Sequence, residues 1–332
     1  MKAFEIAGMH VRPGSRKDLK IRISEFYTAT PVFIPVTVIH GSRPGPVVYV
    51  TAAVHGNEIN GVDMIRQLRA CVDPSRLQGT LILVLIANSI SFTSMTRDLP
   101  DGRDLNRYFP GKDRGSMASQ IAEAIFTKIV KISDFGIDLH TATTGRTNLP
   151  HVRSDMKSPV LRRLAVAFGC EVIFDMPGEE GMLRRAASTA GVPTIVYEAG
   201  EPLKFQKKLI RRGLEGIRNV LGDLKMMDFE RTSPAFQIVI SDHKWLRAGK
   251  GGILNVQVQP GDIIEKGATV AVNTTPFGTE LGRIKAPHSG LVVGVTTVPM
   301  VLPGSAVCHL VSLGSRLPVL RQLLERRPLV FE

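Results

Sequence analysis

The sequence is poor in cysteine. Three of its 332 residues are cysteines, Cys71, Cys170 and Cys308, and they lie far apart without a CxxC pair. An odd number of cysteines at such spacings excludes a disulfide framework of the kind found in small secreted proteins. We therefore predict three reduced, buried cysteines and a cytoplasmic location.

Long hydrophobic runs are also absent. The sequence contains no run of about 18 apolar residues, the length that a membrane-spanning helix requires. The first residues, MKAFEIAGMHVRPGSRK, lack the apolar centre and the small-residue cleavage site of a signal peptide. We therefore expect no membrane partner. With 43% hydrophobic and 22% charged residues, the chain fits a globular protein that is long enough for two domains.

Aromatic residues are scarce, at 6% of the chain, while the net charge is +12. A basic chain can bind nucleic acid, but the lysines and arginines are spread along the sequence, and no motif of a nucleic-acid-binding fold accompanies them. We therefore expect no nucleic-acid partner. A small anionic substrate accounts for the charge equally well. The sequence is compatible with both a monomer and a homo-oligomer.

From about residue 30 to residue 200, apolar runs alternate with helical patterns, which predicts an α/β domain that we expect to span residues 1–225. Short apolar runs bounded by Gly or Pro predict strands at 46–54, 80–88, 135–140 and 192–200. Between the first two strands, spacings of three and four predict a helix with one apolar face, formed by Ile59, Val62, Ile65, Leu68 and Val72. Further helices are predicted at 116–131, 157–168 and 203–221.

The composition changes after about residue 225. From 226 to 315 the segments are short and rich in glycine and turn signals, which predicts a small all-β barrel or sandwich. The runs VQPGDIIEKGATVAV and IKAPHSGLVVGV resemble a biotinyl/lipoyl-like hammerhead. The modified lysine of such carrier proteins would fall at Thr279, so we expect no carrier function. Residues 316–332 are predicted to form a short helix and a C-terminal tail.

Two histidines and a glutamate mark a candidate metal site. His55 and Glu58 follow the first predicted strand, and His140 closes the strand at 135–140. Side chains beyond the carboxyl ends of strands in an open α/β sheet converge on one crevice. Two histidines and one carboxylate are a ligand set of catalytic zinc, which leaves a fourth position for water. Taken alone, the His-x-x-Glu pair is also typical of a turn before a helix.

Glu198 is the candidate general base. Its strand, 192–200, is apolar enough to be buried on both faces, and a carboxylate at such a strand end is costly unless it is paired, protonated or functional. As a base, it would take a proton from water and pass it to the leaving amine. The alternative is an ion-paired or helix-capping glutamate. Glu201 is the nearest competitor, but it lies outside the strand beside Pro202.

The segment TRDLPDGRDLNRYFPG, at 96–111, concentrates arginine and aspartate. An arginine with an adjacent asparagine can bind a carboxylate, and a second arginine can stabilise an oxyanion. The alternative is a solvated charged loop.

Other polar residues have no assigned role at this level. Four further arginines could reach an acidic substrate, and no spacing selects among Arg146, Arg153, Arg184 and Arg185. We interpret His151 and His243 as ordinary surface or turn histidines. Strand alternation turns Tyr197 to the face opposite Glu198, which favours a packing role.

Four ordered motifs resemble the zinc carboxypeptidase superfamily and, within it, the succinylglutamate desuccinylase/aspartoacylase family. These motifs are HGNE from residue 55, RDLPDGRDLNRYFPG from 97, DLH from 138 and YEAG from 197. The resemblance implies a zinc-carboxypeptidase-like mixed sheet flanked by helices, followed by a smaller C-terminal β-domain. It also implies one zinc ion per chain, bound by His55, Glu58 and His140, with Glu198 as the base.

The same resemblance implies roles for the charged loop. Asn106 and Arg107 match the pair that holds the substrate carboxylate. Asp104 matches an aspartate that hydrogen-bonds the first zinc histidine and fixes its tautomer. Arg97 matches the arginine that polarises the scissile carbonyl, with Arg103 as the alternative because the spacing from Arg97 to the LNR run is longer than in aspartoacylase.

We therefore predict a zinc-dependent amidohydrolase that cleaves the amide bond of a small N-acylated amino acid or related N-acyl amine. The expected partner is a small anionic N-acyl substrate. A metallocarboxypeptidase or peptide amidase is the alternative, because Arg107 suits a C-terminal carboxylate equally well. A non-catalytic binding protein is less favoured, because the three zinc ligands and the base are all present.

Overall fold

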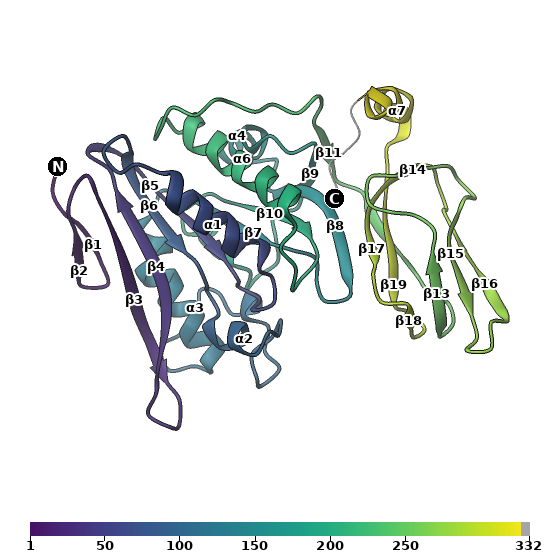
Figure 1. The fold of residues 1–332 in the computed structure, drawn as a ribbon, viewed down its shortest axis with the longest axis horizontal. Coiled ribbons are helices and arrows are strands. Elements are labelled where there is room, and N and C mark those ends of the chain that lie inside the picture. Colours follow the sequence, from purple (N-terminus) through teal and green to yellow (C-terminus); the bar gives the residue numbers. More distant parts are fainter. Residues whose placement is uncertain (327–332) are drawn as a thin grey trace.

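A computed structural model of the chain describes residues 1–326 (Figure 1). Up to residue 225 the strands are β1 (Phe4–Ile6), β2 (Met9–Val11), β3 (Ser15–Glu25), β4 (Pro31–His40), β5 (Arg43–Ala52), β6 (Gln78–Val84), β7 (Phe135–His140), β8 (Arg146–Ser154), β9 (Val172–Asp175) and β10 (Thr194–Gly200). The helices of this part are α1 (Asn60–Cys71), α2 (Ser89–Thr93), α3 (Met117–Lys128), α4 (Pro159–Phe168), α5 (Leu183–Thr189) and α6 (Lys207–Asp223).

After residue 225 the regular elements are strands connected by turns, up to the C-terminal helix. They are β11 (Ile238–Ile240), β12 (His243–Arg247), β13 (Gly252–Val256), β14 (Ile263–Ile264), β15 (Thr269–Thr274), β16 (Glu280–Lys285), β17 (Gly290–Thr296), β18 (Met300–Val301) and β19 (Ala306–Ser312). Helix α7 (Leu317–Arg326) follows, as the sequence predicts, and residues 327–332 of the expected tail lie outside the described residues.

A 13-stranded mixed sheet forms the centre of the protein. Its main path runs β12-β19-β17-β8-β10-β7-β5-β6-β4-β3, and a separate 4-stranded sheet has the order β16-β15-β13-β18. Within the main sheet β6, β5, β7 and β10 are parallel neighbours. The carboxyl ends of these strands therefore lie at the same edge of the sheet, where ligands of α/β proteins usually bind.

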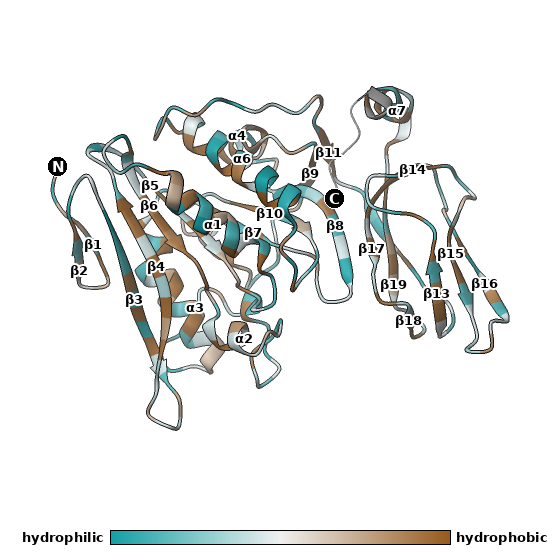
Figure 2. Cartoon of the chain, in the orientation of Figure 1, coloured by the Kyte–Doolittle hydropathy of each residue, from teal (hydrophilic) through white to brown (hydrophobic). Residues whose placement is uncertain are grey.

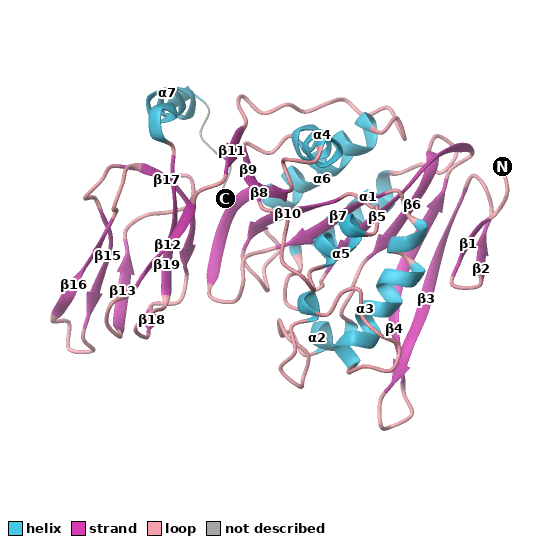
Figure 3. Cartoon of the chain, turned by 180° about the vertical axis from the view of Figure 1, so that it is seen from behind, coloured by secondary structure: helices cyan, strands magenta, loops and turns pink. Residues whose placement is uncertain are grey.

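Helices cover both faces of the sheet. Helices α1, α4 and α6 pack on one face in a large apolar core, while α3 and α5 pack on the other (Figures 1 and 3). The hydrophobic colour runs through β4 and β6, whereas α6 shows hydrophilic patches (Figure 2). Burial of apolar side chains from two sides explains why these strands read as continuous apolar runs. No helix within residues 1–326 is long and apolar enough to span a membrane.

The predicted elements are present, with ends that differ from the prediction by a few residues. The four predicted strands are β5, β6, β7 and β10, and the predicted helices are α1, α3, α4 and α6. The hairpin β3-β4 and the strands β8 and β9 were not predicted. The mixed sheet flanked by helices, with further β-sheet at the C-terminus, confirms the predicted fold class.

The C-terminal strands are hydrogen-bonded to the main sheet. Strand β17 pairs antiparallel with β8, with Gly294 opposite Asn148. Side chains of β8, β9, β11, β17 and β19 share an apolar core with Leu320 of α7. A second core lies between the C-terminal strands themselves. The division into domains at 1–225, 226–315 and 316–332 stays a prediction. Thr279 lies in the exposed turn between β15 and β16.

Candidate zinc site

The end of β5 places the first two candidate ligands. Ala53, just beyond the strand, has a φ of +52°, a left-handed conformation that costs a non-glycine residue about 1 kcal/mol or more. Two residues later His55 begins a turn in which its carbonyl accepts the N–H of Glu58 at 3.1 Å. Gly56 lies against the backbone of Ser91, so a Cβ at this position would overlap it. The turn thus needs glycine because of close packing.

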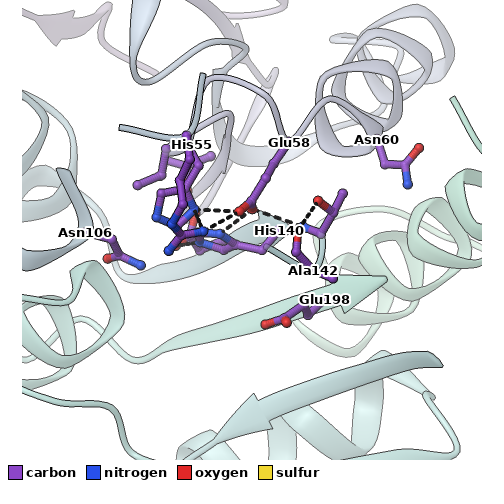
Figure 4. A network of polar contacts seen from close by, with 12 residues as sticks. His55, Glu58, Asn60, Asn106, His140, Ala142 and Glu198 are labelled. Carbon is purple, nitrogen blue, oxygen red and sulfur yellow. Dashed lines mark hydrogen bonds and ion pairs between the residues drawn. The ribbon is translucent and has the colours of Figure 1, made fainter. Parts of the chain in front are cut away.

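His55, Glu58 and His140 converge on one buried point (Figure 4). One potential ligand atom from each lies within 4.8 Å of the other two. The Glu58 carboxylate bridges the histidines, with Oε1 at 2.8 Å from His55 Nδ1 and Oε2 at 2.9 Å from His140 Nδ1. Their exposed fractions are 3%, 1% and 7%. The three predicted ligands therefore meet, in what we call the ligand cluster.

Each histidine of the ligand cluster also contacts a second carboxylate. His55 Nε2 lies 3.0 Å from Asp104 Oδ1, and His140 Nε2 lies 2.8 Å from Asp138 Oδ2. Donation from these Nε2–H groups leaves the Nδ1 lone pairs facing the Glu58 carboxylate. Two lone pairs and a carboxylate then face one another, an arrangement that is favourable only with a positive charge between them. The donor set fits a zinc ion, which binds neutral imidazoles and a carboxylate.

The electrostatics of the ligand cluster also favour a bound cation. Burial raises the pKa of Glu58, but His55 and His140 outweigh it and hold that pKa well below its usual range. Burial lowers the pKa of His140, yet the carboxylates of Asp138 and Glu58 raise it to about 10. Burial raises the pKa of Asp104, but the opposing effects of His55 and Arg97 are larger and hold this pKa well below its usual range. The surrounding carboxylates thus stabilise positive charge at this point.

Arg97 borders the ligand cluster, and Arg103 does not. Arg97 donates to Glu58 Oε1 at 2.9 Å and to Asp104 Oδ2 at 3.1 Å, and its NH1 lies 3.2 Å from His55 Nδ1. Arg103 is exposed and pairs with Asp101. Between these two candidates, the geometry favours Arg97.

Glu198 lies apart from the ligand cluster, on β10 (Figure 4). Its Oε1 accepts hydrogen bonds from Asn148 Nδ2 at 2.6 Å and from Arg153 at 2.8 Å. The competitor Glu201 forms an ion pair with Lys204 and does not line the same cavity. Glu198 is therefore the glutamate of this pair that faces the ligand cluster across open space.

A cavity of about 330 Å³ joins the ligand cluster to Glu198. Five arginines line it: Arg97, Arg107, Arg146, Arg153 and Arg184. Asn106 also lines it; its Oδ1 accepts the N–H of Leu183 at 2.9 Å, and Figure 4 shows its amide nitrogen on the side of the histidines. Trp245, from β12, closes part of the wall and stacks on Arg146, with 4.8 Å from the guanidinium carbon to the ring centre.

Arg184 is the most deeply buried of these arginines, with 6% of its surface exposed. Its side chain makes no hydrogen bond or ion pair with the described residues, and its Nε is buried without a partner. Burial, together with the positive charge of Arg153, lowers its pKa to about 10. A buried guanidinium without a partner is costly, which suggests that a ligand supplies the missing acceptor.

Comparison with known proteins identifies the family. The model of the succinylglutamate desuccinylase/aspartoacylase catalytic domain matches residues 44–224, more than half of the chain. The chain belongs to the succinylglutamate desuccinylase/aspartoacylase family. It is 29% identical over 296 residues to the N-alpha-acetyl-L-2,4-diaminobutyric acid deacetylase of Halomonas elongata, an alignment that covers 82% of this chain and 84% of that protein.

Solved structures share the fold of this family member. The product-bound ectoine utilization protein EutE (DoeB) from Ruegeria pomeroyi has a TM-score of 0.82 at 22% identity, covering 89% of this chain and 95% of that chain. The succinylglutamate desuccinylase/aspartoacylase from Rhodobacter sphaeroides has a TM-score of 0.79 at 24% identity, covering 90% and 95%. The family and fold expected from the four motifs are thus confirmed.

Some expectations for this family member were wrong. His151 is not a surface histidine: it is fully buried on β8 and bonds through Nδ1 to the Leu149 carbonyl at 2.8 Å. His243 is half-buried and lies 3.0 Å from His309. Cys71 is exposed, whereas Cys170 and Cys308 are buried as predicted, and all three are free. Tyr197 packs as predicted, stacked on Phe168.

The sequence did not single out Asp138 or Asn148. Asp138 lies two residues before His140 on the same strand, and this i, i+2 spacing places both side chains on one face of the sheet. Asp138 is the first residue of the DLH motif, but the sequence alone does not indicate its role. Asn148 had no signal of its own, because its contact with Glu198 depends on the pairing of β8 with β10.

Proposed function

We propose that this protein is a zinc-dependent deacylase that hydrolyses the amide bond of a small, anionic N-acyl amino acid or related N-acyl amine. The convergence of His55, Glu58 and His140, with both outer histidine nitrogens bonded to carboxylates, supports the proposal most directly. One such group occurs within residues 1–326, which agrees with one zinc ion per chain. The cytoplasmic location expected from the sequence is part of the proposal.

The residues of the site suit hydrolysis. When bound, zinc would supply Lewis acidity, which favours the loss of a proton from water and draws electrons from a carbonyl group. Glu198 takes a proton from the attacking water, whose oxygen bonds to the carbonyl carbon. As the C–N bond breaks, Glu198 delivers this proton to the leaving amine, so that a carboxylate and an amine result. Asp104 holds His55 in the tautomer that leaves Nδ1 free.

The arginines suit an anionic substrate. We assign Arg97 to the developing oxyanion, because it borders the ligand cluster, and Asn106 with Arg107 to the substrate carboxylate. Arg184 and Arg146 line the same cavity without a carboxylate partner among the described residues. A cavity of about 330 Å³ suits a small N-acyl compound better than a long peptide. The Halomonas relative deacetylates a compound of this size class, N-acetylated diaminobutyric acid.

Replacement of the proposed base tests the reaction. Zinc-loaded Glu198→Gln should bind zinc normally and hydrolyse N-acyl amino acids at least about 100-fold more slowly than the wild type, because general-base catalysis contributes about 100- to 10,000-fold. Release of free amine from a panel of N-acyl amino acids and N-acyl diamines gives the rate. Glu201→Gln is the matched control and should retain the wild-type rate. A fully active Glu198→Gln protein with its zinc in place would refute the role of the base.

A further inference from the structure

Both hydrogen bonds to Glu198 reach the same oxygen. Asn148 Nδ2 and Arg153 NH2 donate to Oε1, while Oε2 receives no hydrogen bond from the described residues. Two donors on one oxygen fix the rotation of a carboxylate more firmly than one. The oxygen that remains, Oε2, is the one that can accept a proton from a water molecule in the cavity.

The buried side chain of His151 bonds to the Nε of Arg153, while the NH2 group of Arg153 bonds to Glu198. The Nε of Arg153 donates to His151 Nε2 at 3.1 Å, and His151 Nδ1 donates to the Leu149 carbonyl at 2.8 Å. These bonds require the neutral Nδ1–H tautomer of His151, with a lone pair on Nε2. Complete burial and the nearby charge of Arg153 lower the pKa of His151 well below its usual value, which keeps this tautomer neutral. His151 therefore acts as a fixed acceptor that sets the plane of the guanidinium.

The third part of this arrangement is the placement of Asn148. Its amide reaches Glu198 while the backbone beside it pairs with Gly294 of β17. A Cβ at position 294 would overlap Asn148 Oδ1. Gly294 thus leaves the room that the Asn148 side chain occupies when it donates to Glu198.

We propose that His151 is a positioning residue for the proposed base, acting through Arg153 to hold Glu198 with Oε2 directed to the attacking water. This inference rests on the proposed function, because it assumes that Glu198 is the base. His151 is not expected to affect zinc binding, since its hydrogen bonds go to Leu149 and Arg153 and not to the ligand cluster. Its removal should consequently lower kcat without loss of zinc.

The experiment compares kcat, KM and zinc content of the zinc-loaded full-length protein and its variants. Arg153→Gln should lower kcat about 10- to 100-fold at similar KM, since a misplaced catalytic group costs up to about 100-fold. His151→Leu should lower kcat by a smaller factor, and His151→Gln should restore part of the loss because its amide oxygen can accept from Arg153. Arg153→Lys should likewise recover part of the rate, because it keeps the charge near Glu198.

Two matched controls separate positioning from stability. Arg212→Gln removes another part-buried arginine. Arg212 lies outside the cavity and forms an ion pair with Glu171, with 3.0 Å between the nitrogen and the oxygen. His40→Leu removes another buried histidine, which bonds Thr80 and the Lys2 carbonyl. Both controls should lower the melting temperature and leave kcat of the folded protein unchanged. If they reduce kcat as much as Arg153→Gln and His151→Leu, the losses reflect stability and the inference is wrong.

Double variants test whether the residues act in series. Arg153→Gln should have no further effect on kcat in a Glu198→Gln background, and His151→Leu none in an Arg153→Gln background. A raised KM with unchanged kcat in Arg153→Gln would show instead that Arg153 binds substrate, and wild-type kcat in both single variants would also overturn the inference. In either case an inactive Glu198→Gln protein would leave the proposed function intact. An active Glu198→Gln protein would remove both.

Discussion

His140 and Arg184 line the same cavity, yet their surroundings differ. His140 lies between the carboxylates of Glu58 and Asp138, and both of its ring nitrogens have partners. Arg184 is as deeply buried as His140 and makes no hydrogen bond or ion pair with residues 1–326. The ligand cluster is thus rich in negative charge and the opposite wall in positive charge. The difference indicates that the first side is arranged to hold a cation and the second to receive an anionic ligand.

Loss of a cluster ligand should have the largest effect. His140→Ala should remove zinc and lower the rate at least about 1,000-fold, because a bound metal supplies several kcal/mol of transition-state stabilisation. Metal analysis of the purified protein and amine release measure the two effects. His40→Ala, a buried histidine outside the cavity, should retain full zinc content. Stoichiometric zinc in His140→Ala would contradict the assignment.

Arg97 is a positively charged residue that bonds directly to the ligand cluster, through Glu58. Arg103, in the same loop, serves as the control substitution. Arg97→Ala should lower kcat about 100- to 1,000-fold, the usual cost of removing an oxyanion donor. Arg103→Ala should change kcat by no more than about twofold, because Arg103 is exposed and its partners, Asp101 and Tyr108, do not line the cavity. The same substrate and zinc-loaded protein serve both measurements. Equal losses in both variants would show that the loop as a whole, and not Arg97, matters.

Arg184 should affect binding more than turnover. Arg184→Gln should raise KM for an anionic substrate about 10- to 100-fold, since a hydrogen bond to a charged group contributes about 1.5–3 kcal/mol. Arg185→Gln, the exposed neighbour, should leave KM unchanged. Steady-state kinetics with an anionic and an uncharged N-acyl compound distinguish binding of the anion by Arg184 from a role of Arg184 in the shape of the cavity. If KM rises equally for both compounds, Arg184 supports the shape of the cavity and does not bind the anion.

The pH dependence of zinc binding should show the smallest effect. The pKa of His140 is raised to about 10, above the ordinary value of 6.5, so in metal-free protein its proton stabilises the fold fully below pH 6.5 and less as the pH approaches 10. Zinc must displace this proton. The rise in melting temperature on adding zinc should therefore be larger at pH 8 than at pH 6. A rise that is equal or smaller at pH 8 would contradict the proton competition.

The sequence predicted the buried strands well, because their signal is local. The run TLILVLIAN predicts β6 without any knowledge of its neighbours. Strand β8, RTNLPHVRS, was missed because it contains a proline and polar residues on both faces. Asn148 and Arg153 bond to Glu198, and Thr147 lies opposite β17, so the polar residues that disguise this strand in the sequence include those that contact the proposed base. Strands whose polar sequence does not predict their burial are common at functional sites.

The candidate site was predictable as far as its residues lie at strand ends. His55, Glu58 and His140 meet as expected, because the parallel strands β5 and β7 end at the same edge. The burial of His151 was not predictable, since it arises when β8 is enclosed by β9, β10 and β17, which are distant in sequence. The contacts of Asn148 and Arg153 depend on the same long-range pairing.

The pairing of Gly294 with Asn148 restricts how this protein can be recombined with its relatives. The pairing of β8 with β17 lies beside the cavity, because Asn148 is opposite Gly294 and its side chain donates to Glu198. We expect a chimera that takes its C-terminal part from another family member to keep the orientation of the proposed base, Glu198, only if glycine stands at position 294. Comparing the activity of such a chimera with and without Gly294→Ala tests this expectation. A single added methyl group at position 294 would then decide which relatives can donate the C-terminal part.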